Sequence, residues 1–286
     1  MVLTRRQGAV LPGSLRPSPP VGHRRRLVAM TGNTAHNVTT SATKTATSKV
    51  VLVTGASSGI GEGISRRLAA EGHRVILTAR RTERLERIAD ELSREGHAAE
   101  ARALDVTDRD AFAALIADVV ATHGSLDVLV GNAGVMLLSR MDALLVDEWD
   151  RMFDVNVRGL YNGIAGVLPH FRTQGSGHVV TIASIGAHEV VGTSAIYSAT
   201  KYAAWALTEG LRQESAPYIR VTTISPGVVE TELADHITDP QAADLMVDYR
   251  AAAISPDAIA RAVNFAIEQP VDVDVNEIIV RPTRQR

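Results

Sequence analysis

The chain has 286 residues, of which 45% are hydrophobic and 22% are charged, proportions that are ordinary for a folded globular protein. No apolar run approaches the roughly 18 residues that a membrane-spanning helix needs, and the chain contains no cysteine. The sequence therefore excludes a chain that is disordered throughout, a collagen-like repeat, disulfide bonds and catalysis by a thiolate. We expect a cytoplasmic protein.

The formal net charge of −2 combines two unlike regions. Residues 1–48 contain seven bases and no acid, which leaves 23 bases against 32 acids in residues 49–286. A region this acidic is poorly suited to nucleic acid, because binding to phosphates requires a basic surface. We therefore expect a small-molecule partner, and neither nucleic acid nor a membrane.

Residues 1–48 combine several prolines, the run Arg24–Arg26 and a Thr/Ser/Asn-rich stretch, without hydrophobic periodicity. This composition is typical of a disordered tail. Three other interpretations stay open. Translation could start at Met30, which would make residues 1–29 a misassigned start. Residues 1–29 could direct the chain to an organelle, since they are Arg-rich and free of acids. The tail could also be an arm that binds nucleic acid or a membrane surface.

From Lys49 onward, short apolar runs alternate with amphipathic segments. The expected strands are Val50–Thr54, Arg74–Ala79, Glu100–Leu104, Val128–Gly131, His178–Ala183, Arg220–Ser225 and Glu277–Val280. The expected helices are Ile60–Glu71, Glu83–Arg94, Arg109–Thr122, Val146–Phe171, Ala195–Ala216 and Pro256–Glu268. This alternation predicts βαβ units. The predicted fold class is α/β: one Rossmann-type domain over residues 49–286, with a doubly wound sheet of seven parallel strands and helices on both faces. Its ligand crevice lies at the carboxyl ends of the strands.

The first motif, Thr54–Gly61, lies between the first expected strand and helix and reads TGASSGIG. Glycines at this position let the backbone turn tightly and approach a pyrophosphate, which would rest on the free N–H groups of the following helix. A plain left-handed loop is the alternative interpretation of the glycines. The position directly after an apolar strand favours nucleotide binding.

A second motif joins Tyr197 and Lys201, with Ser184 thirteen residues before the tyrosine at the end of a strand. Residues four apart share one face of a helix. A lysine ammonium beside the phenol would favour tyrosinate, so we expect a lowered pKa for Tyr197. The tyrosine could then transfer protons near neutral pH. The alternative is an ordinary surface pair, and the conjunction with the glycine-rich turn weighs against it.

Together these motifs resemble the short-chain dehydrogenase/reductase family, in its compact single-domain branch, from about Lys49 to the C-terminus. Gly131 replaces the first Asn of the family's NNAG element. The resemblance implies a catalytic tetrad of Asn156, Ser184, Tyr197 and Lys201. It also implies that the cofactor is bound by Tyr197, Lys201 and the further residues Gly55, Ser57, Ser58, Gly59, Ile60, Gly61, Asp105, Val106, Asn132, Ala133, Gly134, Pro226, Gly227, Val229 and Thr231.

The resemblance also implies a role for each member of the tetrad. Ser184 would bind the substrate oxygen, and Tyr197 would donate or accept the proton. Lys201 would bind the nicotinamide ribose and lower the tyrosine pKa, while Asn156 would position a water that connects Lys201 with solvent. The cofactor would supply the hydride. No metal is required, and relatives of this kind are homodimers or homotetramers, which we expect here.

The cofactor is expected to be NADP(H). The last position of the second strand, where NAD-dependent relatives carry an acid that binds the adenosine ribose, is Ala79, and Arg80 and Arg81 follow it. A guanidinium can bind a 2′-phosphate in a bidentate manner, whereas a carboxylate would repel it. Arg80 is the main candidate. Arg81 is a helper whose alternative is a solvated charge at the start of a helix.

The substrate is expected to be a small alcohol or carbonyl compound. The C-terminal segment Asn276–Thr283 resembles NADP-dependent bacterial reductases of 3-hydroxy acids and other carbonyls, an analogy only. The expected pocket is formed by the loop Ile185–Gly192 and a mobile helical lid from Val228 to about Ala253. Its apolar candidates are Val190, Val191, Ile237, Leu245 and Met246, and His188 is an exposed loop histidine. The alternative function is a cofactor-sensing regulator without turnover, which would not need the tetrad.

Overall fold

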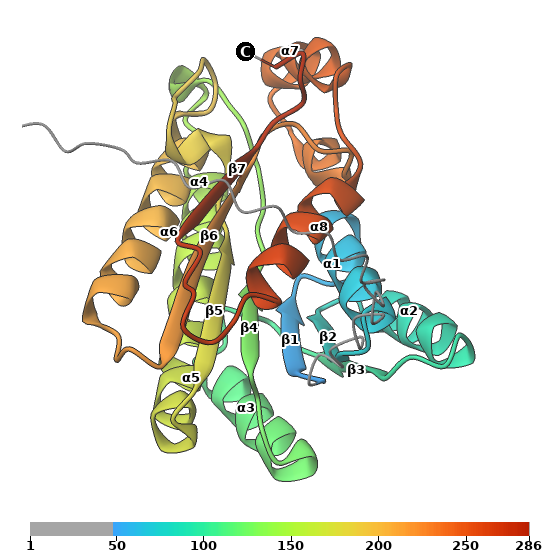
Figure 1. Cartoon of the computed structure of the whole chain (residues 1–286). Helices are drawn as coiled ribbons and strands as arrows, with labels where there is room; N and C mark the ends of the chain where they lie inside the picture. Colours follow the sequence, from blue (N-terminus) through green and yellow to red (C-terminus); the bar gives the residue numbers. More distant parts are fainter. Residues whose placement is uncertain (1–47, 286) are drawn as a thin grey trace, which may run out of the picture. The chain divides into compact units, whose positions relative to one another are not determined.

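The computed structural model describes residues 48–285, in which seven strands form one parallel sheet (Figure 1). The strands are β1 (Val50–Thr54), β2 (Arg74–Ala79), β3 (Ala99–Ala103), β4 (Val128–Gly131), β5 (Gly177–Ile182), β6 (Ile219–Pro226) and β7 (Glu277–Val280). The expectations for the N-terminal tail, namely disorder, a start at Met30 and targeting, lie outside the described residues except at Ser48.

The strand order is β3-β2-β1-β4-β5-β6-β7, which confirms the expected doubly wound sheet. The chain moves outward from β1 to β3, then crosses back to pair β4 with the other side of β1. The connection after β1 leads to β2 on one side, and the connection after β4 leads to β5 on the other side. A crevice therefore opens between β1 and β4 at their carboxyl ends, where doubly wound proteins bind ligands.

Helices cover both faces because side chains alternate along each strand. In β1, Val51 and Val53 belong to one hydrophobic cluster, and Val50 and Leu52 to another. The first cluster includes residues of α1 (Gly59–Ala70), α2 (Thr82–Arg94) and α8 (Pro256–Ile267). The second includes residues of α3 (Arg109–His123), α5 (Gly159–Gln174) and α6 (Ala195–Glu214). Two apolar layers thus hold a fully buried central strand.

The expectation of one continuous helix over Val146–Phe171 is wrong. The structure has α4 (Val146–Phe153), a π-helical turn over Asp154–Arg158, and then α5. Asn156 lies in the turn, where its side chain binds the main chain of Val135. A π turn inserts one extra residue into a helix and is frequent at functional sites. Apolar periodicity continues across such an insertion, so the pattern does not reveal it.

The segment after β6 contains a 3₁₀ turn, Glu232–His236, and α7 (Pro240–Arg250). The helical part of the expected lid is therefore present. Asp239 caps α7 by accepting hydrogen bonds from the N–H groups of Gln241 and Ala242. Among the helices described over residues 48–285, none combines the length and apolar character that a membrane span requires.

Candidate active site

The carboxyl ends of the strands open into a cleft of about 790 Å³. Its walls come from the turns after β1, β2, β4, β5 and β6, together with α7. Ser184, Tyr197 and Lys201 line it, as does every residue expected to bind the cofactor. Asn156 does not line this cleft, because it is buried behind it. The fold thus brings together residues that are more than 170 positions apart in the sequence, such as Gly55 and Thr231.

The glycine-rich turn has the backbone that its sequence suggests. Gly55 and Gly59 have positive φ angles of 67° and 55°, which side chains disfavour. A Cβ atom at Gly61 would collide with the carbonyl oxygen of Gly55. No side chain caps the start of α1, so its first N–H groups are available to an anion. This cradle fits the pyrophosphate of a dinucleotide.

Thr54 and Asn132 fix this turn against β4. The Thr54 hydroxyl accepts hydrogen bonds from the N–H groups of Asn132 and Ala133, both at 3.0 Å. The Asn132 amide Nδ2 donates to the carbonyl oxygen of Thr54 at 2.8 Å. Sequence reasoning did not assign Thr54 this role. A signal was present, since Thr54 is the polar residue that ends an otherwise apolar strand.

Asn156 and Thr200 form a second support under the cleft. Asn156 Oδ1 accepts from the N–H of Val135 at 2.8 Å, and its Nδ2 donates to the Val135 carbonyl oxygen at 2.9 Å and to Thr200 Oγ1 at 3.0 Å. Thr200 in turn donates to the carbonyl oxygen of Tyr197 at 2.7 Å. The π turn is therefore tied to the helix that carries the tyrosine. No sequence pattern singled out Thr200.

Tyr197 and Lys201 share one face of α6, as their spacing predicts. Lys201 Nζ lies 5.8 Å from the centre of the tyrosine ring and donates to the carbonyl oxygen of Ile182 at 3.1 Å. Burial lowers the pKa of Lys201 to about 8. Gly134 leaves room above this lysine, because a Cβ there would lie 3.6 Å from Nζ and 3.3 Å from Asn156 Oδ1.

The expected lowering of the Tyr197 pKa is wrong for this structure. Burial raises the pKa of Tyr197 to about 12, although a hydrogen bond with Ser184 opposes the increase. Desolvation disfavours the charged phenolate, and here it is the largest cause of the shift. The tyrosine is therefore a neutral phenol near pH 7, in the form that donates a proton.

Arginines gather at the opposite end of the cleft, beyond β2. Arg81 donates through Nε to Ser57 Oγ at 3.1 Å and through Nη2 to Ser58 Oγ at 2.6 Å. The exposed Arg80 also lines the cleft, and its charge helps to lower the pKa of Asp105. Burial would raise that pKa, but hydrogen bonds from Thr107 outweigh it.

Two further residues at this end were missed by sequence reasoning. Glu232 accepts hydrogen bonds from Arg81 at 2.9 Å and from Arg84 at 2.7 Å. These arginines lower the pKa of the Glu232 carboxyl to about 2. The contact joins α2 to the segment after β6, and no sequence pattern indicates a pairing over 151 positions.

The substrate end of the cleft is partly as expected. Val191, Leu245 and Met246 line it, together with Leu137 and Leu138. Val190 and Ile237 do not line it. Neither does His188, which was expected to be an exposed loop residue and is half-buried. Its Nε2 lies 3.0 Å from both Ser225 Oγ and Glu277 Oε1.

Comparisons with known proteins identify similar oxidoreductases by both sequence and structure. A family model described as short chain dehydrogenase matches residues 49–242. An uncharacterized oxidoreductase of Staphylococcus saprophyticus is 46% identical over 240 residues, which cover 83% of this chain and 97% of that protein. The alcohol dehydrogenase of the archaeon Thermococcus sibiricus, solved with 5-hydroxy-NADP, has a TM-score of 0.75 at 32% identity, covering 83% of this chain and 98% of that one. A closed form of serine dehydrogenase with NADP⁺ has a TM-score of 0.74 at 32% identity, covering 81% and 94%.

Proposed function

Because this chain belongs to the short-chain dehydrogenase/reductase family of oxidoreductases, we propose that it transfers a hydride between NADP(H) and a small alcohol or carbonyl compound, acting on the CH–OH group. The observation that carries the proposal is the meeting of Ser184, Tyr197 and Lys201 in the cleft that also holds the glycine-rich turn. A regulator that only senses a cofactor would not need a buried lysine beside a buried tyrosine, since burying that lysine costs stability.

The choice of NADP(H) is supported by the arginine end of the cleft. Ala79, Arg80 and Arg81 line it, and the last residue of β2 is Ala79 rather than an aspartate or glutamate. Arg81 already binds the two serine hydroxyls of the glycine-rich turn, so its guanidinium is oriented toward the place where an adenosine phosphate would lie. Two similar solved structures hold an NADP-type cofactor.

Fifteen residues that line the cleft would hold the remainder of the cofactor. The N–H groups at the start of α1, with Gly55, Ser57, Ser58, Gly59, Ile60 and Gly61, would bind the pyrophosphate. Asp105 and Val106 would contact the adenine, and Pro226, Gly227, Val229 and Thr231, with Asn132, Ala133 and Gly134, would border the nicotinamide half. When bound, the cofactor supplies the hydride. The protein's own task is placement and proton transfer.

Proton transfer is assigned to Tyr197, whose phenol is protonated at neutral pH. Ser184 would bind the substrate oxygen and orient it toward the phenol. When Tyr197 donates its proton, the resulting phenolate is stabilised by the Lys201 ammonium on the same face of α6. Asn156, tied to Val135 and Thr200, fixes the π turn behind Lys201 and would position the water of the proton relay. These groups together perform general acid–base catalysis.

The test is NADPH and NADH oxidation by the full chain against a panel of aldehydes, ketones and 3-oxo acids, repeated after removal of residues 1–29. We expect turnover with NADPH on at least one carbonyl and weaker turnover with NADH. Binding of NADPH without oxidation on every carbonyl, and without reduction of NADP⁺ by the matching alcohols, would favour the cofactor-sensing regulator.

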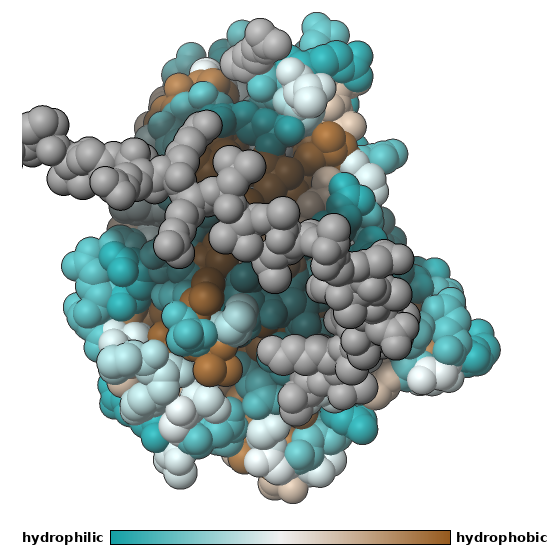
Figure 2. Space-filling view, in the orientation of Figure 1, coloured by the Kyte–Doolittle hydropathy of each residue, from teal (hydrophilic) through white to brown (hydrophobic). Residues whose placement is uncertain are grey.

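We also propose a homodimer or homotetramer. Of the apolar residues on α4, α5 and α6, Val167 and Ile164 are buried in the chain's own core, whereas Leu207, Tyr202 and Phe153 are exposed by 36%, 41% and 42%. Figure 2 shows hydrophobic surface among hydrophilic surface on the face where Figure 1 places β7 and α8. Light scattering that gives only the 30.5 kDa monomer would contradict this. The cytoplasmic location stays a prediction.

A further inference from the structure

Glu232 lines the cleft and binds two arginines at the start of α2. Its Oε2 accepts a hydrogen bond from Arg81 Nη1 at 2.9 Å, and its Oε1 accepts one from Arg84 Nη1 at 2.7 Å. Glu232 and Arg81 both line the cleft. A carboxylate of the protein therefore lies between two guanidinium groups at the end of the cleft where β2 finishes.

The surroundings of this carboxylate form an anion site. Arg81, which binds the carboxylate, also binds the hydroxyls of Ser57 and Ser58. Two guanidinium groups and two hydroxyls are the donors that a phosphate monoester uses, because guanidinium groups bind its oxygens in a planar fork. Glu232 shows where an anion is held in this corner of the cleft.

We propose that Glu232 is a specificity-determining residue that competes with the 2′-phosphate of NADP(H) for Arg81 and Arg84. This rests on the proposed NADP(H) function and adds Arg84 as a phosphate-binding residue. A phosphate placed between the same arginines would be repelled by the carboxylate, so NADP(H) must displace Glu232. NADH has no phosphate at this position and leaves the bridge intact. The glutamate thereby reduces the preference for NADP(H) that the arginines create.

The expected size of the competition is modest. The side chains of Arg81, Arg84 and Glu232 are 43–44% exposed, and ion pairs at exposed positions are weak and screened by salt. We therefore expect about a threefold to tenfold change in affinity when the competing charge is removed. A change of this size is enough to shift cofactor preference without abolishing binding.

The experiment compares Glu232→Gln with Glu230→Gln in the full chain. Glu230 is an exposed carboxylate two residues earlier in the same segment, so its variant changes the net charge equally. Dissociation constants are measured for NADPH and NADH, and for adenosine 2′,5′-bisphosphate and 5′-AMP, which differ only in the 2′-phosphate. Glu232→Gln is expected to tighten NADPH and the bisphosphate by about threefold to tenfold, and to change NADH and 5′-AMP by less than about twofold. Glu230→Gln should leave all four within about twofold.

Arg84→Ala tests whether Arg84 binds the phosphate. This variant is expected to weaken binding of the bisphosphate by about threefold to tenfold, with little effect on binding of 5′-AMP. Unchanged or weaker binding of the bisphosphate by Glu232→Gln overturns the competition, as does equal tightening of NADPH and NADH. Unchanged binding by Arg84→Ala overturns the role of Arg84. A failure of the proposed NADP(H) function would give a different result, because the unmodified chain would then bind NADH better than NADPH.

Discussion

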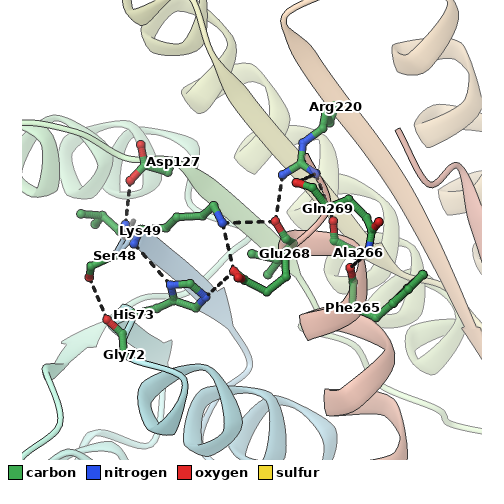
Figure 3. A network of polar contacts seen from close by, with 12 residues as sticks. Ser48, Lys49, Gly72, His73, Asp127, Arg220, Phe265, Ala266, Glu268 and Gln269 are labelled. Carbon is green, nitrogen blue, oxygen red and sulfur yellow. Dashed lines mark hydrogen bonds and ion pairs between the residues drawn. The ribbon is translucent and has the colours of Figure 1, made fainter. Parts of the chain in front are cut away.

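Lys49 and Lys201 lie at opposite ends of the sheet and have different partners. Lys49, at the amino end of β1, donates through Nζ to the carbonyl oxygen of Ile267 at 3.2 Å and to Glu268 Oε1 at 3.0 Å (Figure 3). Lys201 lies at the carboxyl ends of the strands. Its Nζ donates to one carbonyl oxygen, and no described carboxylate pairs with it. Burial lowers the pKa of Lys201 to about 8.

Arg220 extends the contrast at the amino end. Its guanidinium donates to the carbonyl oxygens of Ala266 and Ile267, both at 3.1 Å, and of Gln269 at 3.3 Å (Figure 3). The last carbonyl groups of a helix have no partner within the helix, and cations near them are favourable. Arg220 and Lys49 together satisfy the end of α8.

The comparison shows how one sheet separates stability from function. At the amino ends, charged groups are fully engaged by the protein, so they hold helices and strands together. At the carboxyl ends, Lys201 and Arg80 line the cleft, and no described carboxylate pairs with either of them. Such groups cost stability, a cost common at functional sites. Changes at the two ends should therefore have opposite consequences.

The largest effect is expected for Lys201→Met, with Lys49→Met as its matched control. The first variant removes the cation that stabilises the tyrosine phenolate, so kcat/KM with NADPH should fall by roughly 10²–10⁴-fold, the usual contribution of general acid–base catalysis. Lys49→Met removes the same group from the amino end and should leave kcat/KM of the folded protein within about twofold. Equal losses of kcat/KM in Lys201→Met and Lys49→Met would contradict the proposed difference between the two ends of the sheet.

Arg80→Ala should have the next largest effect. A charge-assisted hydrogen bond is worth roughly 1.5–3 kcal/mol, so NADPH should bind about 10–150-fold more weakly, while NADH changes little. Arg81→Ala should have a smaller effect. Arg87→Ala removes a similar charge from α2, where Arg87 pairs with Glu91 away from the cleft, and should not alter the affinity for either cofactor. An equal loss of affinity for NADPH and NADH would show that Arg80 does not bind the 2′-phosphate.

Arg220→Met should act on stability alone. It removes the arginine donor from the carbonyl oxygens of Ala266 and Gln269 and leaves that of Ile267 with Lys49 alone. This loss costs about 2 kcal/mol in the free energy of unfolding. Urea unfolding would measure the loss, with Arg261→Met as control, because Arg261 is 64% exposed on the same helix. The turnover of folded Arg220→Met should stay near that of the unmodified chain. A turnover defect without loss of stability would contradict the assignment.

The smallest effect concerns pH. The pKa of Lys201 is about 8 in the folded chain and 10.5 for an ordinary lysine. Between these values the unfolded chain binds a proton that the folded chain has released, so the unfolding free energy should rise with pH. The rise is at most on the order of 1 kcal/mol per pH unit. It should be absent from Lys201→Met, measured by urea unfolding between pH 7 and 9.5. If the unfolding free energy of the unmodified chain and that of Lys201→Met depend on pH in the same way, the Lys201 ammonium is not destabilised by burial.

The fold and most of the cleft were predictable from local patterns. Apolar runs gave all seven strands to within a residue or two, and the glycine-rich turn marked the place where the chain leaves β1. The π turn at Asn156 was missed because apolar spacing continues through it. Contacts between distant segments, such as Glu232 with Arg84, were also missed, since they depend on which loops the sheet order brings together. The raised pKa of Tyr197 depends on burial, which spacing along a helix does not reveal.

The central claim is that Tyr197 is the proton donor of an NADPH-dependent reduction. It is tested most directly by kcat/KM of Tyr197→Phe on the best carbonyl of the panel, alongside the dissociation constant for NADPH. The variant keeps the ring and loses only the hydroxyl. Turnover should therefore fall by roughly 10²–10⁴-fold, with NADPH affinity changed by less than about twofold. Near-full turnover of Tyr197→Phe would contradict the assignment of the catalytic group.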